Sequence, residues 1–136
     1  MAARHLLVFS RWPAPGRTKT RLIPALGPEG AARLQEWLTG HTLLGARVWG
    51  ADPDHEARLM FTGASARRFR RWLGPDPRMI PQAPGDLGAR LSDAAARSFA
   101  DGASRVVMTE IDCPGITPDI LARAFDALES ADAVIG

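Results

Sequence analysis

Four basic side chains crowd one short segment near the start of the chain, between Phe9 and Leu22. They are Arg11, Arg17, Lys19 and Arg21. No acidic residue precedes Glu29, and Lys19 is the single lysine of the chain. Like charges at 4 Å repel by about 1 kcal/mol in water and by about 4 kcal/mol where the effective dielectric constant is near 20. A phosphate group between these cations relieves that repulsion, so the segment predicts a site for a polyanion such as a diphosphate.

The residues around this basic segment favour a binding loop over the alternative, a solvated basic face. The unbroken apolar run 6–9 is typical of a buried parallel strand, and a loop containing Pro15 and Gly16 follows it at once. Loops at the carboxyl ends of such strands bind nucleotides in open α/β sheets. The spacing excludes a P-loop, because Gly16 stands three residues before Lys19 and no earlier glycine opens the motif.

A second candidate site lies at Glu110 and Asp112, directly after the apolar run 106–108. Side chains two positions apart on a strand face the same way, so both carboxylates project together if the strand persists to Asp112. Hard cations such as Mg²⁺ or Mn²⁺ prefer oxygen ligands shared with substrate phosphates, which makes the pair a candidate metal site. The alternative is that Asp112 caps the turn at Pro114 and Gly115.

The remaining sequence must supply the elements that position these residues, and it alternates between strand and helix patterns. Expected strands lie at 6–9, 46–49, 58–62, 79–80, 106–108 and 133–135, and expected helices at 28–44, 65–74, 87–102 and 117–128. Ser65 and Thr117 are typical helix N-caps, and Gly74 is a typical helix end. This alternation predicts a single α/β domain over 1–136, with a mostly parallel sheet and helices on both faces.

Composition restricts the class of protein further. At 136 residues with 46% hydrophobic residues, the chain fits one globular domain. No apolar stretch approaches the ~20 residues of a membrane span, so we expect no such span. A single cysteine, Cys113, excludes an internal disulfide and agrees with a reducing compartment, so we expect a cytoplasmic protein.

Arg67, Arg68, Arg70 and Arg71 belong to the expected helix 65–74, together with an apolar stripe of Phe69, Trp72 and Leu73. We interpret this segment as a surface helix. Binding of nucleic acid through it is the alternative, for which one short basic helix is a weak footprint. His5, His41 and His55 form no defensible catalytic triad, and we expect structural or solvent roles for them.

Three motifs follow one another along the chain. The first is Phe-x-Arg-x-Pro-x-Pro-Gly-x-x-Lys-Thr-Arg-Leu at 9–22. The second is Gln82 followed by Gly-Asp-Leu-Gly-Ala-Arg at 85–90, and the third is Asp-Cys-Pro-Gly-Ile-Thr at 112–117. Together they span most of the chain and resemble the DUF2064 group of GT-A-type glycosyltransferases, which are related to cofactor guanylyltransferases. The resemblance implies a Rossmann-like GT-A fold, a nucleoside-diphosphate-sugar donor and a divalent metal.

The resemblance also implies roles for individual residues. Phosphates would be held by Pro15, Gly16, Arg17 and Lys19, with Arg11 and Arg21 beside them, and the nucleotide would lie by Gly85, Asp86 and Gly88. Asp112 would bind Mg²⁺ or Mn²⁺, and Lys19 with Asp112 would stabilise the departing diphosphate. Nucleotidyl transfer from a nucleoside triphosphate is the alternative reaction.

Two departures from the family pattern matter. Glu110 adds a carboxylate where the family usually has a small residue, so it either binds metal or obstructs the donor. Family chains also continue beyond the position of Gly136, which suggests an incomplete carboxyl-terminal half. We therefore expect either part of a longer transferase or a nucleotide-binding module without turnover, with self-association through the apolar segment 133–135.

Overall fold

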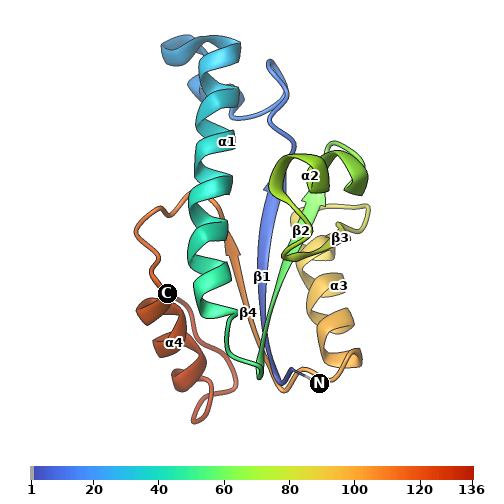
Figure 1. Cartoon of the computed structure of the whole chain (residues 1–136), viewed down its shortest axis with the longest axis vertical. Coiled ribbons are helices and arrows are strands. Elements are labelled where there is room, and N and C mark those ends of the chain that lie inside the picture. Colours follow the sequence, from blue (N-terminus) through green and yellow to red (C-terminus); the bar gives the residue numbers. More distant parts are fainter. Residues whose placement is uncertain (1) are drawn as a thin grey trace.

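The computed structural model describes residues 2–136 and has three layers, with a four-stranded sheet between helices (Figure 1). The strands are β1 (Arg4–Arg11), β2 (His55–Thr62), β3 (Arg78–Pro81) and β4 (Arg105–Glu110). The helices are α1 (Ile23–Trp49), α2 (Ala66–Leu73), α3 (Leu87–Ala100) and α4 (Pro118–Ala127), and a 3-10 turn, η1 (Thr20–Leu22), precedes α1. The expected α/β class is confirmed.

All strand pairs are parallel, in the order β3-β2-β1-β4. The central strand β1 alternates its buried side chains between two cores. Leu6 and Val8 pack with α1, α2 and α4 on one face, whereas Leu7 and Phe9 pack with Ala94 of α3 on the other. Figure 1 shows α1 and α4 together on one side of the sheet and α3 on the opposite side. The parallel arrangement brings the carboxyl ends of all four strands to one edge, which we call the carboxyl edge.

Two expected strands are absent. The segment 46–49 is the last turn of α1, because Leu43, Ala46 and Trp49 continue a helical stripe that is buried against the sheet. The segment 133–135 has no strand partner in the described residues 2–136 and is exposed, with Ile135 98% accessible. Self-association through this segment stays a prediction.

The other helix boundaries follow local sequence signals. Gly27 has φ 74° and breaks the helical path, so that the main part of α1 begins at Pro28, as expected. Ser65, Asp86 and Thr117 accept hydrogen bonds from backbone amides and cap α2, α3 and α4. Several large apolar residues of the helices are exposed: Trp37, Leu87, Phe99 and Ile120. In the described residues no helix is long and apolar enough to cross a bilayer.

Candidate functional site at the carboxyl edge

The basic loop leaves β1 at the carboxyl edge and is fixed by turns of its own backbone. The Trp12 amide donates to the Thr62 carbonyl at the end of β2, and the Arg17 amide closes a turn onto Ala14 at 3.0 Å. Gly16 has φ 80°, a conformation that a side chain would strain. The expectation of a tight glycine turn after β1 is therefore confirmed.

A buried polar network anchors the end of β1 to α1. Ser10 Oγ lies 2.8 Å from Thr39 Oγ1, and Gln35 Nε2 donates to the carbonyl oxygen of Arg11 at 3.1 Å. Thr39 Oγ1 in turn donates to the Gln35 carbonyl. These groups are buried and mutually satisfied, so they hold the start of the loop rigidly. Sequence analysis missed them, because polar residues inside an amphipathic helix resemble solvent-facing positions.

Lys19 and Asp112 meet at this edge although 93 positions separate them in the chain. Lys19 Nζ donates to Asp112 Oδ1 and forms an ion pair with it. The lysine side chain is 13% exposed, whereas the aspartate is 57% exposed. The structure thus brings together the two residues that were expected to act together on a diphosphate.

Lys19 also has an unusual backbone. Its φ of 47° makes it the one non-glycine residue with positive φ among residues 2–136. The left-handed conformation costs about 1–2 kcal/mol for a residue with a Cβ atom. Such strain clusters at functional sites, where the surrounding structure enforces it. Here it places the ammonium group at the mouth of the loop, against Asp112.

The remaining cations of the loop have no carboxylate partner in the described part of the chain. Arg11 ends β1, Arg17 follows the glycine turn, and Arg21 lies in η1. All three side chains are exposed, and none forms an ion pair within residues 2–136. Three guanidinium groups therefore remain free to meet an anion beside Lys19.

Glu110 ends β4, and its backbone lies in register with Phe9 of β1. β4 ends at Glu110 and does not continue to Asp112. The two carboxylates therefore do not project from one face of a strand, as they would if the strand had continued. Buried Ile111 separates the two exposed acids. Both side chains still lie at the carboxyl edge.

The loop that carries Asp112 is held by α1. His41 Nε2–H donates to the carbonyl oxygen of Pro114 at 2.8 Å. The His41 ring stacks on the Trp37 ring, with the ring centroids 4.9 Å apart. Sequence analysis gave His41 a structural role without a partner, because nothing in the sequence places α1 beside this loop. The contact makes His41 a support of the Asp112 loop.

The turn at 84–88 is the third part of the edge. Asp86 Oδ1 accepts from the Ala89 amide at 2.8 Å, so this carboxylate is the N-cap of α3. Arg90 braces the turn through the Gly85 carbonyl and through Gln82, which itself donates to Met60 of β2. Gly85 has φ 112°, which explains the glycine there. Within residues 2–136 no side-chain hydrogen bond joins this turn to Lys19 or Asp112.

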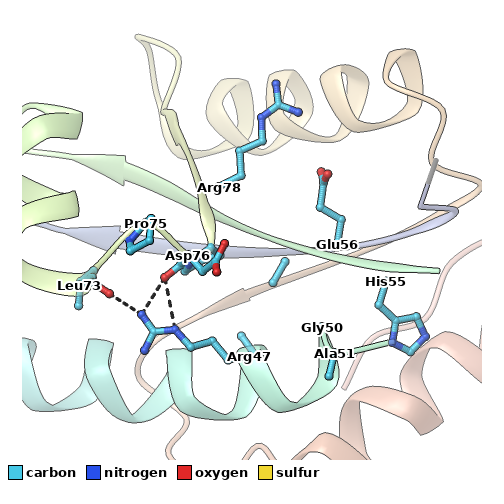
Figure 2. A pocket seen from close by; sticks show the side chains of 12 residues that line it. Arg47, Gly50, Ala51, His55, Glu56, Leu73, Pro75, Asp76 and Arg78 are labelled. Atoms are coloured by element: carbon cyan, nitrogen blue, oxygen red, sulfur yellow. Dashed lines mark hydrogen bonds between the residues drawn. The ribbon is translucent and has the colours of Figure 1, made fainter. Parts of the chain in front are cut away.

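Two cavities lie at the opposite, amino-terminal edge of the sheet. One has a volume of about 680 Å³ and is lined by Arg47, His55 and Arg78 among others. Figure 2 shows that Arg47 crosses it to donate to the carbonyl groups of Leu73 and Asp76, the latter at 2.7 Å. This guanidinium braces the loop between α2 and β3. We therefore place the functional site at the carboxyl edge, where the cations are unpaired and where open parallel sheets bind ligands.

The second cavity, of about 450 Å³, is lined by a cluster of charged residues around buried Arg58. Arg58 is 2% exposed and binds Glu56 and Asp101, the latter at 2.8 Å. The hydrogen bond from Arg58 lowers the pKa of Asp101 below its usual value. Burial, and then the charge of Arg58, lower the pKa of His5. The acids of this cluster balance its buried cation, so it supports the fold.

The parallel sheet with helices on both faces places this protein in the class with the nucleotide-diphospho-sugar transferase fold. The chain belongs to the DUF2064 family, whose description is an uncharacterized protein conserved in bacteria and whose model matches residues 46–136. The basic loop precedes the matched residues. No curated protein matches the chain.

A solved structure supports the same assignment and includes the loop. It is a proposed nucleotide-diphospho-sugar transferase from Desulfovibrio desulfuricans G20, which matches with a TM-score of 0.85 and 29% sequence identity. The match covers 96% of this chain and 56% of the other. The chain therefore spans little more than half the length of the solved protein that it resembles.

Proposed function

We propose that this chain binds the diphosphate of a nucleoside-diphosphate sugar at the carboxyl edge and serves a glycosyltransferase-type reaction. The observation that carries the proposal is the contact between Lys19 and Asp112 in an edge otherwise rich in unpaired arginines. The solved transferase with the same fold supports the choice of a nucleotide sugar.

Each loop residue has a distinct part in this proposal. Lys19 supplies a compact ammonium group for one phosphate, and its strained backbone holds it in place before the ligand arrives. Arg17 and Arg21 offer planar guanidinium groups that can grip phosphate oxygens in pairs. The exposed Gly16 lets the backbone approach the ligand closely, since nothing lies within 4 Å of the position its Cβ would take.

These charges act on the leaving group. When the bond between the sugar and the diphosphate breaks, negative charge accumulates on the diphosphate. Cations fixed in advance around it stabilise that charge by several kcal/mol, without a protein nucleophile. We therefore assign Lys19 to stabilising the departing diphosphate, with the neighbouring arginines in support.

The carboxylates of Asp112 and Glu110 would bind a divalent metal only together with oxygen atoms of substrate phosphates. In residues 2–136 no group of three or more metal-binding side chains is present, so the protein supplies no complete cage. Mg²⁺ commonly keeps its waters and binds one or two carboxylates plus phosphate oxygens, which matches exposed Asp112 and Glu110. These two residues would hold Mg²⁺ or Mn²⁺, which neutralises phosphate charge when bound. Asp112 would then leave its ion pair with Lys19.

The turn 84–88 would lie beside the nucleoside. Gly85 and Gly88 are exposed and carry no side chain over the backbone of the turn, and Asp86 rigidifies the turn as the α3 cap. Arg90 holds the Gly85 carbonyl, so the turn needs no rearrangement to receive a ligand.

Calorimetric titration with UDP and GDP, each with and without Mn²⁺, tests the proposal. Wild type is expected to bind at least one diphosphate more tightly than the monophosphate with the same base. Arg123→Ala is the matched control, because Arg123 is exposed on α4 and has no ion pair among the described residues. Equal affinity for mono- and diphosphates would overturn the diphosphate assignment. Release of nucleoside diphosphate from a panel of nucleotide sugars then separates a transferase from a module that only binds.

A further inference from the structure

Helix α2 carries four arginines in eight residues, Arg67, Arg68, Arg70 and Arg71, which we call the α2 arginines. All four side chains are exposed, and within residues 2–136 none of them forms an ion pair. Arg4 and Arg58, at the other end of the sheet, differ, since Arg4 pairs with Glu129 and Arg58 pairs with two acids. Exposed arginines without an ion pair also occur singly elsewhere, but they gather on α2 and in the loop after β1.

These charges work against the helix that carries them. Like charges three or four positions apart, such as Arg67 with Arg70 and Arg71, each cost about 0.2–0.5 kcal/mol. Arg67 and Arg68 in the first turn also oppose the helix dipole, whereas Arg70 and Arg71 in the last turn are favourable to it. Packing stabilises α2 instead, through fully buried Phe69. An anion bound between the guanidinium groups would make the charges favourable.

Aromatic contacts join α2 to the candidate donor site. Trp12, in the basic loop, meets the rings of Phe69 and Trp72 edge-on at 5.2 and 5.5 Å. The Arg68 guanidinium lies 4.4 Å from the centre of the Trp12 ring. Figure 1 shows α2 at the same end of the sheet as the loop after β1. The α2 arginines therefore flank the loop without belonging to it.

We propose that the α2 arginines bind the phosphate group of a second, phosphorylated substrate, beside the diphosphate of the donor. That the bound molecule is a substrate rests on the proposed function, whereas the anion site itself does not depend on it. Lys19, Arg17 and Arg21 already match the charge of one diphosphate, so the α2 arginines are in excess of the donor's need. Guanidinium groups bind phosphate oxygens through paired hydrogen bonds.

The dimensions and the polarity of α2 select a small ligand over a macromolecule. Eight residues of helix span about 12 Å, which suits one or two phosphate groups. The apolar residues of α2, namely Phe69, Trp72 and Leu73, pack inward and are not exposed for insertion into a bilayer. A nucleic-acid duplex would require phosphate contacts over a longer basic surface.

The test uses glucose 1-phosphate as the probe, with glucose as the unphosphorylated comparison, in the presence and absence of saturating UDP. The variant Arg67→Ser/Arg70→Ser/Arg71→Ser removes three charges and leaves Arg68 on Trp12. The control Arg33→Ser/Arg78→Ser/Arg123→Ser removes three exposed arginines that form no ion pair in the described residues. Both variants have the same net charge.

We expect wild type and the control to bind glucose 1-phosphate within about twofold of each other, and the α2 variant to bind it at least about tenfold more weakly, because each lost contact is charge-assisted. UDP affinity should be unchanged in the α2 variant. Conversely, Lys19→Ala should weaken UDP binding and leave glucose 1-phosphate binding intact.

Equal loss of probe binding in the control and the α2 variant would overturn the inference. Loss of probe binding in Lys19→Ala would also overturn it, because it would place the probe in the donor loop. Absence of probe binding to wild type would overturn it too. So would α2-dependent binding of a single-stranded oligonucleotide, or of phosphatidylserine vesicles, in preference to the probe. Failure of UDP to bind wild type would refute the proposed function alone, since the probe is also measured without UDP.

Discussion

At the scale of single residues, Lys19 combines a positive φ with an ion pair to Asp112. Strain and charge can be separated by substitution at this position. Glycine adopts the left-handed conformation without cost, whereas alanine retains the strain, and both remove the ammonium group. The two substitutions therefore affect stability differently and ligand binding alike.

We expect Lys19→Ala and Lys19→Gly to weaken nucleoside-diphosphate binding equally, by about 1–3 kcal/mol, because both remove a charge-assisted contact. Lys19→Gly should be more stable than Lys19→Ala by about 1 kcal/mol, because it relieves the strain. Calorimetry measures the first effect and urea denaturation the second. Unchanged affinity in both variants, with intact folding, would exclude Lys19 from the phosphate site.

The two acids allow a second comparison, using Mn²⁺ binding as the readout. We expect Mn²⁺ alone to bind weakly and Mn²⁺ with UDP to bind more tightly, since phosphate oxygens complete the coordination shell. Asp112→Asn should abolish this enhancement, whereas Glu110→Gln should reduce it less. Electron paramagnetic resonance of free Mn²⁺ measures both. The same enhancement in wild type and Asp112→Asn would show that Asp112 does not hold the ion.

The sequence was informative for Lys19 and Asp112 because each follows an apolar strand, and parallel strands bring their carboxyl ends to one edge. It could not show that Lys19 meets Asp112, since that contact depends on the adjacency of β1 and β4. His41 and Gln35 were beyond prediction for the same reason. Their partners are backbone carbonyl groups of segments remote in sequence, and such groups carry no side-chain signature.

At the scale of elements, the strands with continuous apolar runs and the helices with clear caps were predictable. α2 has the boundaries that Ser65 and Gly74 indicate. The expectation of a strand at 46–49 was wrong because a short apolar run fits a strand and a helix equally well. Its true state is set by the length of α1 and by burial of Trp49 against Phe125, with the rings 4.8 Å apart.

Asp86 offers a test at this scale, because it caps α3 and also lies in the proposed nucleotide turn. Asp86→Ala should lower the free energy of unfolding by about 1 kcal/mol, whereas Asp86→Ser should restore most of it, since serine also caps helices. Urea denaturation checks this. If both variants bind UDP as wild type does, Asp86 acts only as a cap. Weaker binding in the serine variant at normal stability would assign the carboxylate to the nucleotide.

At the scale of the whole molecule, the cluster of Arg58, Glu56, Asp101 and His5 links stability to pH. The folded state lowers the pKa of His5 from 6.5, so the unfolded chain binds a proton that the folded chain resists. The contribution of His5 is therefore fully present above pH 6.5 and is lost as the pH falls from there through the folded pKa.

We expect the free energy of unfolding to fall as the pH drops below 6.5, by at most about 1.4 kcal/mol per pH unit for one proton. His5→Gln should flatten this part of the profile, because glutamine does not titrate. His41→Gln is the control for loss of a histidine outside this cluster. A wild-type slope retained in His5→Gln would assign the dependence to other groups.

The position of β1 has a consequence for synthesis on the ribosome. β1 is made before β2, β3 and β4, yet it lies between β2 and β4 and needs hydrogen bonds from both. Its second edge stays open until Arg105–Glu110 has left the exit tunnel, and Lys19 has no Asp112 to meet until the same moment. Until then the nascent chain exposes the apolar run 6–9 of β1, which favours engagement by a chaperone that binds extended apolar segments.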